Sequence, residues 1–147
     1  MEDFEKVNIS TLYDSQQKVF LKIKRTASWI DQKVNEFLKP YKISEQQYNI
    51  LRILRGAGDE ITVKTVKERM IRKSPNATRL MDKLNDKKLI ERSRCENDRR
   101  VVYVKITNKG LQLLEKIDFR KFDHTIQNLT IQESKTLIKL LDKIEEN

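Results

Sequence analysis

The segment from residue 62 to residue 110 constrains the fold most strongly, because a serine–proline pair divides its first half into two short patterns. The first pattern places three apolar residues at helical spacing: Val63, Val66 and Met70. Thr62 precedes them and is a suitable N-cap, since its hydroxyl can accept from a backbone N–H of the first turn. A helix cannot pass through Ser74-Pro75, because proline lacks a backbone N–H and disfavours helix at the preceding residue. Proline suits the first position of a helix, so we predict a second helix with Ser74 as its cap.

The second predicted helix has one apolar and one polar face. The apolar face follows the i, i+3, i+4, i+7 pattern of a helix packed on a core: Ala77, Leu80, Met81 and Leu84. The polar face carries side chains suited to a DNA major groove: Asn76, Thr78, Arg79 and Lys83. Asparagine pairs with adenine, arginine with guanine, threonine with a base edge or a thymine methyl, and lysine with a phosphate. We therefore expect a helix that reads double-stranded DNA; the alternative is an ordinary surface helix.

A basic hairpin is predicted next. The segments Leu89 to Arg94 and Val101 to Ile106 read as two strands, and the second shows the alternation of a half-buried strand. The polar loop between them can lie in a minor groove, where arginine is favoured. We predict that Arg100 enters the groove and that Asp98 pairs with it. Phosphate contacts are expected from four further side chains: Ser74, Lys83, Arg94 and Arg99. The alternative is a surface hairpin with an exposed ion pair, which contributes little to stability.

The net positive charge of the protein is confined to this segment. The whole chain carries 31 lysines and arginines against 22 acidic residues, a net charge of +9. Between Lys64 and Lys109 the numbers are 15 and 6, so the remainder of the chain is balanced. A basic region of this kind is the electrostatic footprint expected for binding to phosphate, and the alternative is a solvated basic surface.

The predicted elements follow the order helix, turn, helix, strand, loop, strand. Together with the run NDRRVVYVKITNKG, this order resembles the MarR family of winged helix-turn-helix transcription regulators. The shared residues are Thr78-Arg79-Leu80 and Leu84 in the second helix, Asp98-Arg99-Arg100 in the wing, and Ile106-Thr107 with Lys109-Gly110 after it. The family usually has glycine at the position of Lys88, where a left-handed helix terminus favours glycine. Lys88 must therefore adopt that conformation, or the turn must differ.

Longer helices are predicted on both sides of the hairpin. Their expected bounds are about 11–38, 45–55, 108–127 and 131–145. Capping boxes open two of them, from Ser44 to Gln47 and from Thr130 to Glu133, and Thr107 caps the helix after the hairpin. The family resemblance also implies that Ile61 adds a small third strand beside the wing.

A chain of 147 residues is expected to form one domain, here of mainly α (α+β) class over residues 1–147. A winged helix-turn-helix head with a small β-hairpin wing occupies about 44–107. The helices over about 11–38 and 108–147 present apolar faces that this head is too small to cover. The resemblance implies that they interlock with a second copy in a two-fold homodimer, and the alternative is that they pack together within one chain. Two heads related in this way would read half-sites about one turn of DNA apart.

The sequence contains no motif for catalysis, a cofactor or a metal ion. It lacks a glycine-rich phosphate loop, paired cysteines and a His-x-x-x-His pair, so we expect neither an enzyme nor a cofactor. The one histidine, His124, is expected to be a structural or surface residue. We find no secretory signal and no apolar run of roughly 20 residues, which favours a cytoplasmic protein without a membrane partner.

Two further candidate sites involve a cysteine and three aromatic residues. Cys95 has arginines nearby in sequence that would favour its thiolate, so its oxidation could alter DNA contact; the alternative is an unreactive thiol. Some relatives in the family are thiol-based oxidant sensors, but their cysteine is near the N-terminus, where this chain has none. The resemblance implies a small aromatic effector at the junction of head and terminal helices. Trp29, Phe37 and Tyr48 are the candidate pocket residues, with core packing as the alternative.

The leading hypothesis is a homodimeric transcription repressor that binds a pseudo-palindromic site in double-stranded DNA and is released by a small molecule. One alternative is a regulator that responds to oxidation of Cys95. Another is a winged-helix protein-interaction module without DNA readout. A binder of double-stranded RNA is a third, although a helix cannot enter the deep, narrow major groove of A-form RNA.

Overall fold

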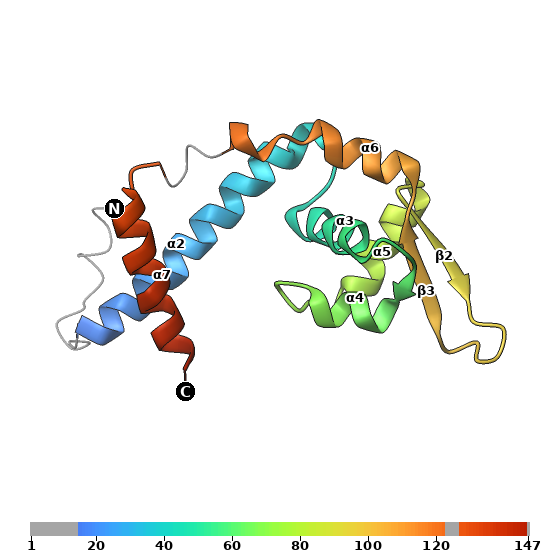
Figure 1. The fold of residues 1–147 in the computed structure, drawn as a ribbon, viewed down its shortest axis with the longest axis horizontal. Helices are drawn as coiled ribbons and strands as arrows, with labels where there is room; N and C mark the ends of the chain where they lie inside the picture. The colour runs from blue at the N-terminus through green and yellow to red at the C-terminus, as the bar shows by residue number, and fades with distance from the viewer. Residues whose placement is uncertain (1–14, 123–126, 147) are drawn as a thin grey trace.

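The computed structural model describes residues 15–122 and 127–146, and this part of the chain is mainly helical with one small sheet (Figure 1). The elements are α2 (Ser15–Leu38), η1 (Lys39–Tyr41), α3 (Glu45–Ala57), β1 (Ile61–Thr62), α4 (Val63–Arg69), α5 (Ala77–Asp86), β2 (Ile90–Arg94), β3 (Val102–Ile106), α6 (Asn108–Lys116), η2 (Phe119–Lys121) and α7 (Ile131–Glu145). The predicted fold class is confirmed. Of the helices in the described ranges, none has the length and apolar character needed to cross a membrane.

The sheet is antiparallel, with the strand order β1-β3-β2. The third strand implied by the family resemblance is present, since Ile61 pairs with Val104. The β2–β3 hairpin is paired from Ile90 opposite Ile106 to Arg94 opposite Val102. Each strand begins one residue later than the sequence predicted.

The core of the head lies between α3, α4, α5 and the inner face of the sheet. The side chains that are at most 1% exposed there are Ile50, Leu51, Leu54, Val66, Ala77, Met81, Leu84, Ile90 and Val104. The apolar stripe predicted for α5 is therefore the face that it buries, with Leu80 only half-buried at its margin. Burial of this face leaves the polar face of α5 in solvent.

The helix caps predicted at Ser44, Thr62, Thr107 and Thr130 are confirmed, whereas Ser74 does not cap α5. Ser44 and Gln47 form a capping box at the start of α3, and Thr130 and Glu133 form another at the start of α7. The backbone N–H and hydroxyl of Thr130 both donate to the Glu133 carboxylate, which lowers the pKa of Glu133. The hydroxyls of Thr62 and Thr107 accept backbone N–H groups of α4 and α6. Short polar side chains thus define these starting points locally.

Three helix boundaries differ from the prediction. The smallest difference is at α3, which ends at Ala57 instead of about residue 55. The helix predicted over 108–127 ends at Lys116, because Ile117 turns to an extended backbone and buries its side chain in the core. The part of that prediction over 123–126, with His124, lies outside the described residues, as do the predicted first turns from residue 11. The helix predicted to begin at Pro75 begins at Ala77. Ser74 accepts the N–H of Asn76 on its hydroxyl and the N–H of Ala77 on its carbonyl, so a turn precedes the helix.

Lys88 occupies the turn position at which the family usually has glycine. Its φ of 59° is left-handed, so lysine adopts the conformation that glycine favours. Its N–H donates to Asn85 O, and the N–H of Leu89 donates to Leu84 O, which satisfies carbonyls at the end of α5. The turn geometry expected for the family is therefore kept, at the expense of backbone strain.

The terminal helices carry apolar faces that the described chain leaves exposed. Helix α7 buries none of its side chains, and α2 buries only Val34 and Leu38 near its C-terminal end. Exposed apolar side chains on the two helices are Val19, Phe20, Trp29, Ile131, Leu137, Ile138, Leu140 and Ile144. Figure 1 shows α7 and most of α2 on the side of the molecule away from the sheet.

Candidate nucleic-acid interface

The polar face of α5 is open to solvent at its N-terminal end. Thr78, Arg79 and Lys83 are exposed on the helix, and Asn76 is exposed in the turn before it. Ser74 is half-buried, and its hydroxyl oxygen accepts from Asn76, which leaves the hydroxyl hydrogen available to a ligand. These side chains are those expected to read a major groove, and burial of the opposite face fixes which way they point.

The turn between α4 and α5 is held by the first two long helices. Arg72 in the turn forms an ion pair with Asp31 of α2, and the N–H of Ile71 donates to Asn49 Oδ1 of α3 at 3.1 Å. The turn that leads into α5 is therefore tied directly to α2. This contact was not predicted, because it joins residues 41 positions apart.

A second carboxylate lies beside this ion pair. Burial raises the pKa of Glu45, the nearby Asp31 carboxylate raises it further, and Arg72 lowers it in part. The charge of Arg72 therefore acts on both carboxylates, Asp31 in α2 and Glu45 at the start of α3, although its ion pair is with Asp31. Protonation of Glu45 relieves their repulsion.

The wing loop is ordered by a carboxylate. Asp98 Oδ1 accepts the backbone N–H of Arg100 at 3.0 Å, and the carbonyl of Asp98 accepts the N–H of Val101. The sequence predicted that Asp98 would pair with the Arg100 guanidinium, and no such ion pair occurs within the described ranges. Asp98 thus directs Arg100 through its backbone, while the side chains of Arg94, Arg99 and Arg100 remain exposed.

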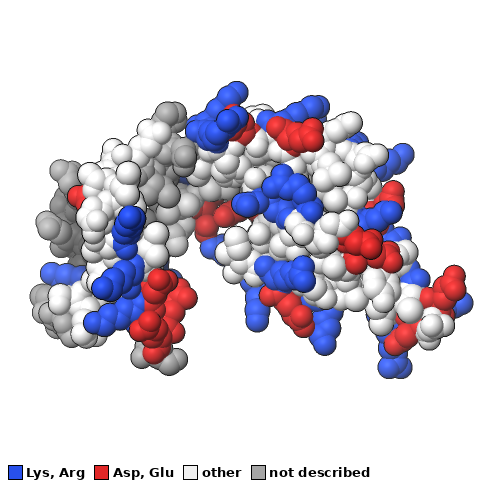
Figure 2. Space-filling view, viewed as in Figure 1, with Lys and Arg blue, Asp and Glu red and all other residues white. Residues whose placement is uncertain are grey.

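A hollow of about 520 Å³ lies between the wing, α4 and the start of α5. It is lined by Thr62, Val63, Lys64, Lys67, Thr78, Arg92, Arg100, Val101 and Val102, and we call it the basic hollow. Four of these residues are cationic and none is acidic. Figure 2 shows basic side chains along the lower edge of the head, where α4 and the hairpin tip lie in Figure 1, with acidic ones among them. The basic hollow therefore favours an anion.

Arg92 fixes the wing to α5 within the basic hollow. Its guanidinium forms an ion pair with Asp82 and donates to Thr78 O at 3.2 Å. Its Nε is buried without a hydrogen-bond partner among the described residues. A buried donor without a partner is unfavourable, and this one is closed to solvent, so it offers no contact to an anion in the hollow. No DNA-binding role was predicted from the sequence for Arg92, Lys64 or Lys67. The spacing of three between the two lysines, off the apolar face of α4, was the available signal.

The family model for the MarR family matches residues 43–102, from just before α3 into β3. Multiple antibiotic resistance protein MarR of Salmonella typhimurium is 35% identical over 118 residues, which cover 78% of this chain and 81% of that protein. The chain belongs to the MarR family. HTH-type transcriptional regulator MhqR of Bacillus subtilis is 26% identical over 130 residues, which cover 86% of this chain and 89% of that protein. These relatives are transcriptional regulators rather than enzymes, and this chain is a winged-helix regulator of their family.

Solved structures share the MarR fold. A mutant MarR of E. coli complexed with operator DNA matches with a TM-score of 0.76 and 29% identity, over 90% of this chain and 99% of that chain. A MarR-like transcription regulator from Bacillus cereus matches with a TM-score of 0.81 and 19% identity, over 89% and 96% of the two chains. The second likeness supports the fold alone.

The aromatic residues of this MarR-family chain gather where α2 meets the head. The Phe119 ring lies 5.1 Å from that of Phe37 and 4.7 Å from that of Tyr48, between ring centroids. Phe122 and Tyr41 extend the cluster on the Phe37 side. Two of the three candidate pocket residues therefore share a neighbour. Trp29 does not join them; it lies about two turns away on α2 and is 47% exposed.

Cys95 lies just past the end of β2 and is half-buried. Its backbone N–H donates to Val101 O, which closes the base of the wing loop. The thiol is therefore placed at the base of the loop, away from the exposed tip.

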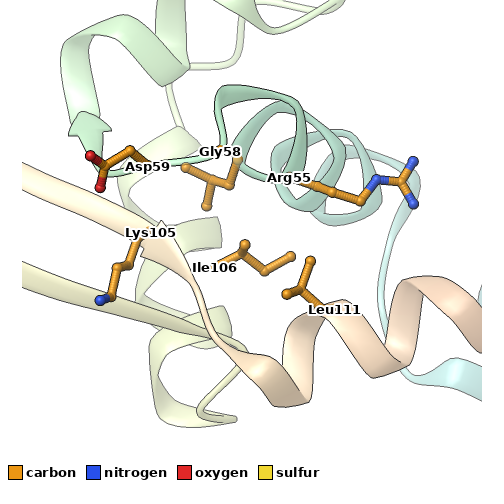
Figure 3. Close-up of a pocket in the computed structure, with 7 residues that line it drawn as sticks. Arg55, Gly58, Asp59, Lys105, Ile106 and Leu111 are labelled. Carbon is orange, nitrogen blue, oxygen red and sulfur yellow. The ribbon is translucent and has the colours of Figure 1, made fainter.

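A smaller hollow of about 290 Å³ lies at the C-terminal end of β3, the end that does not join the wing loop (Figure 3). The ends of α3 and β3 and the start of α6 line it, with Leu54, Ile106 and Leu111 as its apolar part. Figure 3 shows Arg55, Asp59 and Lys105 pointing away from one another. These charges do not converge on a common point, unlike those of the basic hollow.

Proposed function

We propose that this MarR-family regulator binds a pseudo-palindromic operator in double-stranded DNA as a homodimer and acts as a repressor. The observation that carries the proposal is the basic hollow beside the exposed polar face of α5. A groove-reading helix flanked by a cationic concavity combines base readout with phosphate binding, the two parts of sequence-specific DNA recognition. The relative complexed with operator DNA supports the same assignment.

The proposal gives each side chain a role. Base edges in the major groove are read by Asn76, Thr78 and Arg79. Arg100 enters the minor groove, with the loop shaped by Asp98. Phosphates are held by Ser74, Lys83, Arg94 and Arg99, and we add Lys64 and Lys67 from the basic hollow.

The homodimer is supported by the exposed apolar faces of α2 and α7. Contiguous apolar surface on a small protein marks an interaction site. We propose that residues 1–147 form one domain, in which about 11–38 and 108–147 provide the dimer contacts and about 44–107 the DNA-binding head. A two-fold dimer presents two α5 helices to half-sites about one turn of DNA, roughly 34 Å, apart.

Release by a small aromatic effector completes the proposal. The cluster around Phe37 and Tyr48 lies where α2 meets the head, and Asp31 of α2 holds the turn before α5. A ligand that shifts α2 would therefore change the orientation of α5. Such a shift in either subunit alters the fit to both half-sites.

Selection from a random duplex pool tests operator binding. The purified protein is mixed with random-sequence DNA, the bound fraction is sequenced, and the affinity for the selected site is measured against salt. We expect two inverted half-sites about one turn apart and a steep loss of affinity as salt rises. Weak binding without an enriched sequence would contradict the proposal. A flat salt dependence would favour a protein-interaction module, and effective competition by double-stranded RNA would favour an RNA binder.

A further inference from the structure

A lysine-rich pocket lies on the side of the head away from the proposed DNA surface. Its volume is about 470 Å³, and we call it the lysine pocket. It is lined by Tyr41, Lys42, Lys87, Leu89, Lys109, Gln112, Leu113 and Lys116. In Figure 1, α6 and η1 lie along the upper edge of the molecule, whereas α4 and the hairpin tip lie along the lower edge.

The charges of the lysine pocket are uncompensated. Four of its eight lining residues are lysines and none is acidic. Within the described part of the chain, none of these lysines forms an ion pair. The four come from three separate parts of the chain that converge on one concavity, so an anion in the pocket would be attracted from several sides.

Two of the ammonium groups are already oriented. Lys87 Nζ donates to Lys42 O, and Lys109 Nζ donates to Lys87 O at 3.0 Å. An ammonium has three donors, so each of these groups keeps two for a ligand. Tyr41 donates its hydroxyl to Lys116 O at 3.3 Å, which joins η1 to the end of α6 across the pocket.

The floor of the lysine pocket is apolar. Leu89 is 5% exposed, and Leu113 and Tyr41 are half-buried beside it. A volume of this size falls within the range of small-molecule sites, about 300–1,000 Å³. An apolar floor under a ring of cations suits a ligand that has a flat apolar body and more than one negative charge.

We propose that the lysine pocket binds a soluble amphipathic polyanion, of which an aryl phosphate is the simplest form. This site is separate from the basic hollow, and it adjoins the aromatic cluster around Phe37 and Tyr48 through Tyr41, whose ring contacts Phe37. Helix α5 connects the two charged sites, because Thr78 near its start lines the basic hollow and Lys87 at its end lines the lysine pocket. Occupancy of the lysine pocket therefore acts on the end of the helix that carries the proposed DNA-reading residues.

The test uses 1-naphthyl phosphate as the probe and its own fluorescence anisotropy as the readout. We expect saturable binding with one probe per chain. The Lys109→Gln/Lys116→Gln variant is expected to bind about tenfold more weakly, since each lost cation of a partly exposed site weakens binding by a few-fold. The matched control is Lys64→Gln/Lys67→Gln, which removes the same charge from the basic hollow and is expected to leave probe affinity unchanged.

Several results would overturn the proposal. One is loss of probe binding in Lys64→Gln/Lys67→Gln but not in Lys109→Gln/Lys116→Gln. Inorganic phosphate binding as tightly as 1-naphthyl phosphate would refute the role of the apolar floor. Absence of probe binding, with lysine-dependent sedimentation on phosphatidylglycerol vesicles, would assign the pocket to a lipid surface.

Thermal unfolding by circular dichroism verifies that each variant folds. The single substitution Lys116→Gln is a milder second variant, because the Lys116 side chain makes no described bond. It is expected to lower probe affinity about threefold. None of these readouts requires operator DNA, so the outcome is independent of the proposed function.

Discussion

Arg79 and Lys83 lie about one turn apart on the exposed face of α5, but their side chains suit different tasks. Arginine can pair with two acceptors on guanine, whereas lysine provides a point charge for a phosphate. We predict that Arg79→Ala weakens binding to the selected operator by about 1–3 kcal/mol and relaxes sequence preference at one base pair. Lys83→Ala should weaken all sequences alike and reduce the salt slope by about 1. Binding to the operator and to single-base variants at several salt concentrations distinguishes these outcomes.

Equal losses on every sequence for both variants would show that Arg79 also contacts phosphate. The role assignment on α5 would then be wrong, although DNA binding itself would stand.

Lys88 carries strain that a glycine would remove. A left-handed conformation disfavours a residue with a Cβ by about 1–2 kcal/mol, whereas glycine gains about 0.4–1 kcal/mol of freedom in the unfolded chain. We therefore predict that Lys88→Gly raises the free energy of unfolding by about 0.5–1 kcal/mol. Urea denaturation followed by circular dichroism measures the change.

Lys87→Gly is the matched control for this turn. Lys87 has a right-handed backbone at φ −78°, so glycine there relieves no strain, adds freedom to the unfolded chain and removes the hydrogen bond from Lys87 Nζ to Lys42 O. It should lower the free energy of unfolding by about 0.5–1 kcal/mol. A loss of stability in both variants would mean that the left-handed turn at Lys88 is not strained.

Packing between elements depends on one glycine of α6. A Cβ built on Gly110 would lie 2.3 Å from Leu89 O and 2.7 Å from Ile106 Cγ1, both parts of the sheet margin that α6 covers. We predict that Gly110→Ala lowers the free energy of unfolding by about 1–3 kcal/mol or more, although alanine is the better helix former.

Gly56 provides the control within another helix. It lies in α3, and a Cβ there would meet nothing within 4 Å. Gly56→Ala should therefore raise the free energy of unfolding by about 0.5–1 kcal/mol through helix propensity alone. Chemical denaturation of both variants is the measurement, and equal effects of the two substitutions would refute the close approach of α6 to the sheet.

The contribution of Arg72 to the free energy of unfolding, through its link between α2 and the turn before α5, should depend on pH. The Arg72 side chain is 62% exposed, so we predict that Arg72→Gln lowers the free energy of unfolding by only about 0.2–1 kcal/mol near pH 7. Because Arg72 lowers the pKa of Glu45, its removal raises that already elevated pKa further above the ordinary 4.5. A carboxyl with a raised folded-state pKa stabilises the fold at low pH and loses that contribution as pH rises through this pKa. The deficit of Arg72→Gln should therefore be smallest near about pH 4 and largest near about pH 7.

Arg69→Gln removes the same charge from an exposed position of α4. Urea denaturation of both variants across this pH range should show a pH-dependent deficit for Arg72→Gln only. If the stability deficit of Arg72→Gln did not change with pH, repulsion between Glu45 and Asp31 would not be its cause.

The elements were predictable where their causes are local. Thr62, Thr107 and the two capping boxes mark helix starts because a side chain bonds to a backbone N–H three residues away. The end of α6 was not predictable, because Ile117 leaves the helix to bury its side chain against a core that only the folded chain provides. The start of α5 was displaced for a similar reason, since Ser74 closes a turn instead of capping at once.

The candidate site was predictable in part. The polar residues of α5 followed from periodicity, because the buried face determines the exposed one. Arg92 could not be assigned in this way, since its contacts with Asp82 and Thr78 cross from β2 to α5. The pairing of Asp98 with the backbone of Arg100 likewise depends on the loop conformation rather than on residue types.

At the scale of the whole molecule, the apolar faces of α2 and α7 are exposed to solvent in the single chain. Leu137 lies near the middle of the apolar face of α7 and is 44% exposed in the single chain. A charge placed there would be buried on dimerisation without a partner, which is strongly unfavourable. We predict that Leu137→Glu converts a dimer into a monomer at micromolar concentration, as measured by sedimentation velocity.

Gln132→Glu is the matched control, because it adds the same charge to the opposite face of α7 and leaves the Thr136 hydroxyl bonded to the residue 132 carbonyl. It should remain dimeric. Since two linked heads bind a two-part site more tightly than one, Leu137→Glu should also lose about 10²-fold or more in operator affinity, whereas Gln132→Glu should lose little. A wild-type protein that sediments as a 17.5 kDa monomer, or a Leu137→Glu variant that remains dimeric, would show that α7 does not form the dimer contact. A monomeric Leu137→Glu variant with unchanged operator affinity would instead show that each head binds DNA independently, which contradicts the inverted half-site geometry.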